Sequence, residues 1–155
     1  MTQTPFDSTD RAILQELQRD GRIKNQLLAD RVGLSAAACW RRVKALEDAG
    51  VIRGYTALLD PVKMDQGLCV LVTVSLTRHG VDIGQTFEAA VSGWPEVVQC
   101  YAVTGSADYQ LRVVVPDIAS YDTFLNTRLF TLDGVAQVHS NFALREVKNL
   151  PGLPL

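Results

Sequence analysis

The 155-residue chain has no large excess of charge, since 15 Lys and Arg face 17 Asp and Glu and the formal net charge is −2. This balance excludes proteins that hold nucleic acid by bulk basicity, such as histones, although a local basic face can still bind it. No apolar run reaches the roughly 18 residues needed to cross a bilayer, and the richest, Leu68 to Leu76, has the length of a strand. The polar, acidic start, Met1 to Asp10, does not fit a secretory signal. We therefore expect a soluble cytoplasmic protein without a membrane partner.

The chain is also poor in metal-binding and nucleophilic side chains. Its three cysteines, Cys39, Cys69 and Cys100, lie far apart without a C-x-x-C pair, and its two histidines are His79 and His139. This spacing does not form a zinc site, so we expect reduced thiols that act as small apolar side chains. The histidines and Tyr101 form no recognisable acid–base or nucleophile set, and we assign no catalytic residue.

The spacing of apolar residues changes near Asp60-Pro61, from a helical pattern to alternating strands and helices. Residues 1–60 hold nine Lys and Arg against eight Asp and Glu, whereas residues 61–155 hold six against nine. The basic residues therefore belong disproportionately to the first half. We predict two domains, residues 1–60 and 68–155, joined by a linker at 61–67 that Pro61 and Gly67 bracket.

The first half predicts three helices and a strand. Asp7 can cap the first helix, Gly33 can adopt the left-handed conformation that stops the second, and Ser35 can cap the third. The predicted elements are helices over residues 7–21, 25–32 and 35–49 and a strand over 52–59. A short turn joins the last two helices, which predicts a winged helix-turn-helix with its motif at about residues 25–44.

The third helix is predicted to bury Cys39, Val43 and Leu46 and to expose Ala37, Ala38, Arg41, Arg42 and Lys44. Small residues at its start would allow close approach to base edges in the major groove, and the cations would meet phosphates. Trp40 can pack against the sugar-phosphate wall or against the domain core. The candidate DNA-binding residues are Ser35, Ala36, Ala37, Ala38, Trp40, Arg41, Arg42 and Lys44. On charge alone, a solvated basic face explains this helix as well, but the turn, the caps and the strand together favour double-stranded DNA as a partner.

The second half predicts the α+β order βαββαβ. The expected strands cover residues 68–77, 97–104, 108–115 and 135–147, and the helices cover 82–93 and 118–130. This order is the ferredoxin-like plan, a four-stranded sheet with two helices on one face. The helix faces predicted to be apolar consist of Ile83, Phe87, Ala90 and Val91, and of Ile118, Tyr121, Phe124 and Leu125. The strands carry apolar residues at consecutive positions, as in Val70-Leu71-Val72, and therefore on both faces of the sheet. The helices cover one face, so we expect a second subunit to cover the other.

Taken together, these residues resemble the Lrp/AsnC family of bacterial and archaeal transcription regulators, also called feast/famine regulators. The matching segments span nearly the whole chain: Asp7 to Leu17, Asp20 to Arg22, Leu28 to Ser35, Cys39 to Ile52, Thr104 to Tyr109, Glu146 to Lys148 and Leu153 to Leu155. One departure is Ala36-Ala37-Ala38, where the family often carries Pro and Ser or Thr. This chain therefore has fewer hydroxyl groups for DNA contacts, which leaves the operator sequence open.

The resemblance implies that the second domain is an amino-acid-sensing module of the RAM type, with its effector pocket around a G-x-x-D-Y loop at subunit interfaces. The implied effector-binding residues are Tyr101, Thr104, Gly105, Ser106, Ala107, Asp108 and Tyr109. A glycine-containing turn can present backbone N–H groups to a carboxylate, and Asp108 can accept from an ammonium group. The same pattern also fits a plain hairpin turn. The Leu-Pro-Leu ending and the Cys-Trp recognition helix resemble members that answer to leucine or methionine, and no other cofactor is expected.

Three functions follow from these patterns. In the first, a dimer that assembles further into tetramers or octamers docks its third helices into successive major grooves, and an amino acid changes the packing between subunits. In the second, an architectural protein binds DNA without a ligand. The third is an enzyme, because siroheme decarboxylases of heme biosynthesis are relatives that share both domains. They carry Tyr-Arg and His pairs near the pocket, where this chain has Tyr101-Ala102, so we do not expect an enzyme.

Overall fold

The computed structural model describes residues 6–77, 82–150 and 152–155. By its internal contacts the chain forms two units, one made of residues 1–58 with Lys148–Leu155 and the other of Leu59–Val147. The expected second domain, residues 68–155, therefore differs at its C-terminal end. Lys148–Leu155 groups with the first unit because side chains of the first helix bond its backbone. No helix among the described residues is long and apolar enough to cross a membrane.

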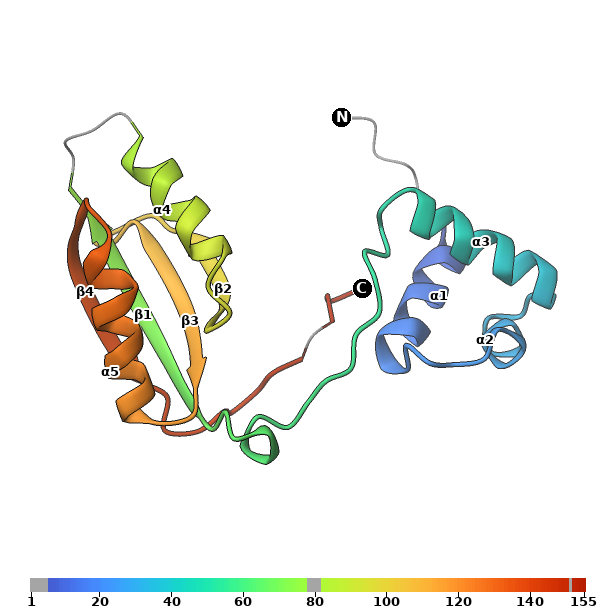
Figure 1. The fold of residues 1–155 in the computed structure, drawn as a ribbon. Helices are drawn as coiled ribbons and strands as arrows, with labels where there is room; N and C mark the ends of the chain where they lie inside the picture. The colour runs from blue at the N-terminus through green and yellow to red at the C-terminus, as the bar shows by residue number, and fades with distance from the viewer. Residues whose placement is uncertain (1–5, 78–81, 151) are drawn as a thin grey trace. The chain divides into compact units, whose positions relative to one another are not determined.

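The first unit contains the three predicted helices, α1 (Ser8–Arg19), α2 (Asn25–Val32) and α3 (Ala36–Asp48) (Figure 1). Asp7 caps α1 in a capping box, since its carboxylate accepts from the Asp10 N–H at 2.8 Å and the Asp10 carboxylate accepts from the Asp7 N–H. Gly33 ends α2 with a φ of 70°, in the left-handed region that glycine adopts without strain. The core of the unit consists of Ile13, Leu28, Ala29, Cys39 and Leu46. The prediction of three helices from caps and stop signals is confirmed.

The predicted strand at residues 52–59 is wrong. After α3 the chain runs without regular secondary structure as far as the short 3₁₀ turn η1 (Val62–Met64) (Figure 1). A strand needs a neighbour to share its ladder of hydrogen bonds, and no described segment of this chain pairs with residues 52–59. The segment leaves the apolar side chains of Tyr55, Leu58 and Leu59 exposed.

The second unit has the ferredoxin-like order, as predicted. Its elements are β1 (Leu68–Leu76), α4 (Ile83–Ser92), β2 (Val97–Ala102), β3 (Tyr109–Val115), α5 (Ile118–Thr127), η2 (Leu129–Thr131) and β4 (Val135–Phe142). The antiparallel sheet has the order β2-β3-β1-β4. β4 ends at Phe142 and not at Val147, because its last pairing is with Val70, next to the start of β1.

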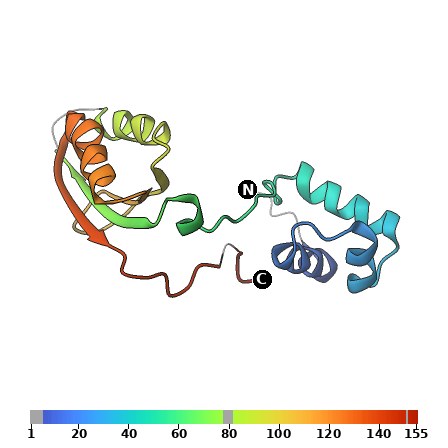
Figure 2. The same cartoon turned by 60° about the horizontal axis from the view of Figure 1, so that its bottom comes forward.

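Both helices cover one face of the sheet, as two views show (Figures 1 and 2). The residues of β1 and β3 on that face are buried with Phe87, Val91, Tyr121 and Phe124. Ile118 was expected to join them but is 67% exposed, because it is the first residue of α5. The opposite face is more polar than predicted, since Leu71, 43% exposed, shares it with Gln110 and Arg112.

Candidate DNA-binding helix and effector loop

Local contacts hold α3 against α2 at the turn. The Ser35 hydroxyl accepts from the Ala38 N–H at 3.2 Å and so caps α3. The Asn25 side chain, at the start of α2, donates to the Ala36 carbonyl at 2.9 Å. Sequence reasoning missed Asn25, whose only signal was a polar side chain at a helix start. These bonds fix the angle at which the first turn of α3 is presented.

The outward face of α3 carries Ala37, Trp40, Arg41 and Lys44, all exposed. The sequence leaves Trp40 either against the sugar-phosphate wall of DNA or in the domain core. It is 61% exposed and therefore does not belong to the core. The inward face buries Cys39 and Leu46 as predicted, whereas Val43, also predicted to be buried, is half-buried. Ser35 is exposed as well, whereas Ala36 and Ala38 are half-buried. Ala38 therefore differs from its predicted exposure, because it lies on the flank of the buried stripe.

Arg42 does not lie on the exposed face, contrary to the prediction. Its guanidinium Nη1 donates to the Asp7 and Asp10 carboxylates at 2.8 Å each, and the side chain is half-buried. These bonds, first to Asp10 and then to Asp7, raise the pKa of Arg42 above its ordinary value. The bond from the Asp10 backbone and the contact with Arg42 lower the pKa of the Asp7 carboxyl against a desolvation effect that raises it. Arg42 thus ties the recognition helix to the N-terminus of α1.

Lys44 is paired differently. Its ammonium lies 2.8 Å from the Asp48 carboxylate, one turn along α3, and this hydrogen bond raises the pKa of Lys44. An exposed pair of this kind is weak and can open to a phosphate. Within the described part of the chain, Arg41 has no ion-pair partner. The charge that α3 offers to a polyanion is therefore concentrated at Arg41, with Lys44 behind it.

The second candidate site, the loop between β2 and β3, is bonded to the end of β1. The Asp108 carboxylate accepts from the Leu76 N–H at 2.7 Å through Oδ2, and the Asp108 N–H donates to the Val74 carbonyl at 3.0 Å. The Ser75 hydroxyl donates to the Ser106 carbonyl at 3.3 Å. Gly105 has a φ of 119°, which strongly favours glycine. No hydrogen bond to the second oxygen of Asp108, Oδ1, occurs among the described residues.

The two candidate tyrosines lie on opposite faces of the sheet. Tyr101 pairs with Gln110 and is exposed on the face without helices. Tyr109 is buried under α4, where its hydroxyl donates to Glu88 at 2.8 Å and its ring lies 4.6 Å from that of Phe87. Burial, then the Glu88 bond, raise the pKa of Tyr109 to about 12. A hollow of about 370 Å³ between α4 and β2 is lined by Glu88, Val91, Ser92, Val97, Val98, Gln99, Cys100, Ala102 and Tyr109.

The structure therefore brings part of the predicted effector set together. Gly105, Ser106 and Asp108 gather at the end of β1. Thr104, which precedes them, is exposed, and Ala107 between Ser106 and Asp108 is half-buried. Tyr101 and Tyr109 flank this loop on different sides of the sheet and cannot contact the same small molecule from one face. The loop offers backbone N–H groups and one carboxylate oxygen, which suits a ligand that carries both an anion and a cation.

On the open face of the sheet, Tyr101 and His139 lie too far apart to act as an acid–base pair. Tyr101, Gln110, Thr73 and His139 occupy successive strands in one row, β2-β3-β1-β4. Three strand spacings of about 4.8 Å put Tyr101 and His139 roughly 14 Å apart. His79 lies outside the described residues. Among residues 6–77, 82–150 and 152–155, no group of three or more His, Cys, Asp or Glu is placed to hold a metal ion.

Two family models match the chain, one over its N-terminal part and one over its C-terminal part. Residues 6–53 match a winged helix-turn-helix DNA-binding model, and residues 69–153 match the Lrp/AsnC ligand binding domain. The chain is 44% identical over 143 residues to the leucine-responsive regulatory proteins of Salmonella typhimurium LT2 and Escherichia coli K12, covering 92% of this chain and 87% of each relative.

Solved structures agree with these matches. A transcriptional regulator from Neisseria meningitidis in complex with L-methionine superposes with a TM-score of 0.93 at 42% identity, covering 97% of both chains. An AsnC family transcriptional regulator from Agrobacterium tumefaciens gives a TM-score of 0.91 at 42% identity, covering 96% of this chain and 97% of that one.

Proposed function

The chain belongs to the Lrp/AsnC family of transcription regulators, and from that premise we propose that it binds double-stranded DNA through α3 and responds to an amino acid at the Gly105–Asp108 loop. The observation that carries the first part is the outward face of α3, where Ala37, Trp40 and Arg41 are exposed together behind a capped, tightly held turn. A small residue allows close approach to base edges, and a cation meets the phosphates. As a DNA-binding regulator it would act in the cytoplasm and not as an enzyme.

The two tryptophans provide an assay of DNA binding. Trp40 is exposed on α3, whereas Trp94 is buried in the core of the second unit. Duplex DNA should protect Trp40 from quenching by acrylamide and leave Trp94 unaffected. In Trp40→Phe, the remaining fluorescence should not respond to DNA. A wild-type fluorescence that never responds to DNA, at any salt concentration, would contradict the placement of α3 in the groove.

For the effector we propose an aliphatic amino acid, leucine or methionine, because relatives of the chain include leucine-responsive regulatory proteins and a regulator solved in complex with L-methionine. The Asp108 carboxylate would accept from the ammonium group through Oδ1 while Oδ2 continues to hold the Leu76 N–H. The backbone N–H groups near Gly105 would bind the carboxylate. An amino acid present at about 100 times its Kd adds roughly 2.7 kcal/mol to the stability of the folded state.

Thermal denaturation in the presence of each of the twenty amino acids tests this proposal. We expect one or two aliphatic amino acids to raise the melting temperature. Asp108→Asn is the informative variant, because its amide oxygen can still accept from the Leu76 N–H while the negative charge is lost. It should keep the fold and lose the response, whereas Asp108→Ala should lose both the strand contact and the response. If no amino acid raises the melting temperature, the architectural, ligand-independent function is favoured instead.

Self-association is the remaining part of the proposal. The helices cover only one face of the sheet, and Leu71 lies exposed on the other. The unpaired segment at residues 52–59 also exposes apolar side chains. A second copy that covers the sheet face would give the two-fold symmetry that paired operator half-sites require, and further association into tetramers or octamers would extend it. Sedimentation of Leu71→Asp should show dissociation of the assembly, with Ile118→Asp, exposed on α5, as the matched control.

A further inference from the structure

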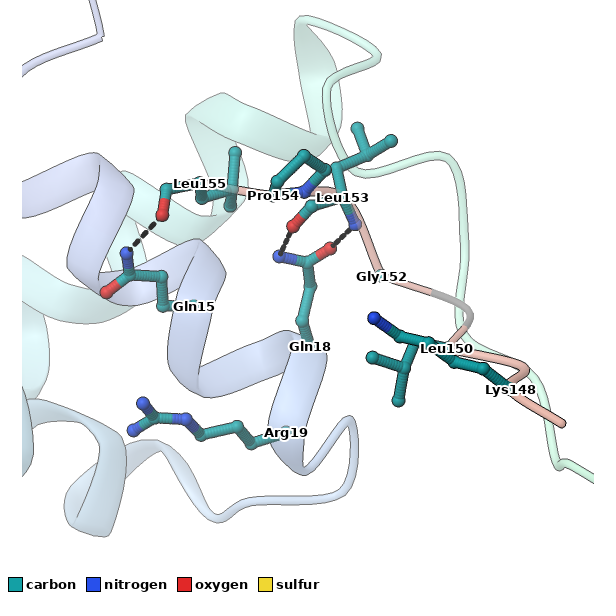
Figure 3. Close-up of a pocket in the computed structure, with 9 residues that line it drawn as sticks. All are labelled: Gln15, Gln18, Arg19, Lys148, Leu150, Gly152, Leu153, Pro154 and Leu155. Carbon is teal, nitrogen blue, oxygen red and sulfur yellow. Dashed lines mark hydrogen bonds between the residues drawn. The ribbon is translucent and has the colours of Figure 1, made fainter.

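The outer face of α1 holds the C-terminal segment of the chain, Lys148–Leu155. The Gln15 side chain donates to the backbone oxygen of Leu155 at 2.9 Å (Figure 3). The Gln18 side chain donates to the Leu153 carbonyl at 3.2 Å and accepts from the Leu153 N–H. Gln15 and Gln18 are three residues apart and therefore project from the same side of the helix. The two side-chain amides therefore form hydrogen bonds with the backbone of the segment, at Leu153 and Leu155.

The contact depends on backbone bonds and little on apolar burial. Leu150 and Leu153 remain 70% and 74% exposed, and residues of the segment line an open groove of about 730 Å³ together with residues of α1 (Figure 3). Hydrogen bonds at exposed positions contribute little net stability, because water replaces them when they open. The held and released states of the segment are therefore close in free energy, as a reversible contact requires.

Gly152 fits this contact for a steric reason. A Cβ atom at this position would lie 2.8 Å from Oε1 of Gln18, the atom that accepts from Leu153. Because Oε1 is the far end of a flexible side chain, a larger residue would force the Gln18 amide to shift and would disturb its two bonds to Leu153. Glycine allows the backbone to lie this close to the Gln18 amide without that shift.

The segment gives the DNA-binding unit a second connection to the sheet. The first is the stretch after α3 that leads to β1, and the second is residues 143–147, which join β4 to Lys148–Leu155. Resting on the proposed DNA-binding function, we propose that Gln15 and Gln18 form a docking site for Lys148–Leu155, and that docking restricts the DNA-binding unit and thereby sets the affinity for paired half-sites. A restricted unit loses less freedom on binding two sites at fixed spacing.

Two sets of variants release the segment by different routes. Gln15→Ala with Gln18→Ala removes the donors, and Gly152→Ala displaces the Gln18 amide. The matched controls are Gln85→Ala, an exposed glutamine of α4, and Gly93→Ala, where a Cβ meets its nearest neighbour at an ordinary 3.5 Å. Amide hydrogen exchange of Leu153 reports docking directly, because its N–H donates to Gln18. Melting temperatures check that each variant is folded.

The affinity of full-length protein is then measured for three duplexes. The first is a paired-site duplex that the wild type enriches from a random library, the second is one half of it, and the third has five base pairs inserted at its centre. Both releasing variants should bind the paired duplex about fivefold more weakly, bind the half duplex equally well, and lose less affinity on the half-turn insertion. Unchanged Leu153 exchange in both variants would overturn the docking site. Faster exchange with wild-type affinity for all three duplexes would overturn the restriction. A wild type that binds no duplex would refute the proposed function, and with it the restriction, while the exchange would still decide the docking.

Discussion

Replacing Arg41 and Arg42 one at a time separates the cation that we expect to contact DNA from the cation that holds α3 against α1. Arg41 is exposed and has no ion-pair partner in the described part of the chain, whereas Arg42 is bonded at 2.8 Å to both Asp7 and Asp10. For Arg42 to reach a phosphate, it would have to abandon two carboxylates at the N-terminus of α1. We therefore expect Arg41→Ala to weaken DNA binding and Arg42→Ala to act on stability.

The salt dependence gives the magnitude. Each phosphate neutralised on duplex DNA contributes about −0.9 to the slope of log K against log salt concentration. A dimer that loses Arg41 from both subunits loses two such contacts, so its slope becomes shallower by about 1.8. Over a fourfold rise in salt, from about 50 to 200 mM, the ratio of wild-type to variant affinity should therefore fall about 12-fold. Arg42→Ala should leave the slope unchanged and lower the melting temperature, because Asp7 and Asp10 lose their common partner.

Fluorescence anisotropy with a labelled duplex, measured at several salt concentrations, tests both expectations. Measurements at low salt are essential, because the contribution of Arg41 to affinity is largest there and is screened as the salt concentration rises. Equal slopes for wild type and Arg41→Ala would refute the assignment of the phosphate contact. A slope that becomes shallower in Arg42→Ala with an unchanged melting temperature would show that Arg42 leaves its carboxylates to bind DNA.

Four further substitutions test the structure itself. Ile13→Ala and Leu111→Ala empty fully buried positions in the two separate cores and should each cost about 2–5 kcal/mol in denaturant unfolding. Gly33→Ala places a Cβ at a φ of 70° and should cost about 1–2 kcal/mol of stability in the same assay. The pKa of Tyr109, about 12 in the folded protein, lies above the ordinary value of about 10. Its contribution to stability is therefore complete below pH 10 and declines as the pH rises toward 12, and Tyr109→Phe should lose this part of the alkaline decline in pH-dependent unfolding.

The elements that sequence predicted well are specified by neighbouring residues. The stop at Gly33, the caps at Asp7 and Ser35, and the order of strands and helices after residue 67 depend on short-range patterns, and the structure confirms them. The strand at residues 52–59 was predicted from local preference alone. A strand also needs a partner, and none of the described segments of the chain provides one.

The candidate sites show the same division between local and long-range information. The exposure of Arg41 and Lys44 follows from helical periodicity, which the sequence displays, whereas the sequence leaves two environments open for Trp40. The bonds of Arg42 to Asp7 and Asp10 join residues more than 30 positions apart, and sequence reasoning saw Asp7 only as a cap. Opposite-charge pairs across such separations cannot be chosen from sequence, because many carboxylates compete for each cation. The sequence therefore places Arg42 among the exposed cations of α3, whereas the structure pairs it with two carboxylates of α1 and its N-cap.

In the proposed effector site, Asp108 would link the ligand to the fold. Because Oδ2 already accepts from the Leu76 N–H, an ammonium group at Oδ1 would draw electron density away from that bond and weaken it. β1 begins at Leu68 and pairs with both β3 and β4, so a change at its end can shift the register or twist of the central strands. A ligand shifts an equilibrium only by binding two states with different affinity. The hydrogen bond between Asp108 and β1 is a contact that can differ between those states, and amide exchange of Leu76 with and without the amino acid would measure that difference directly.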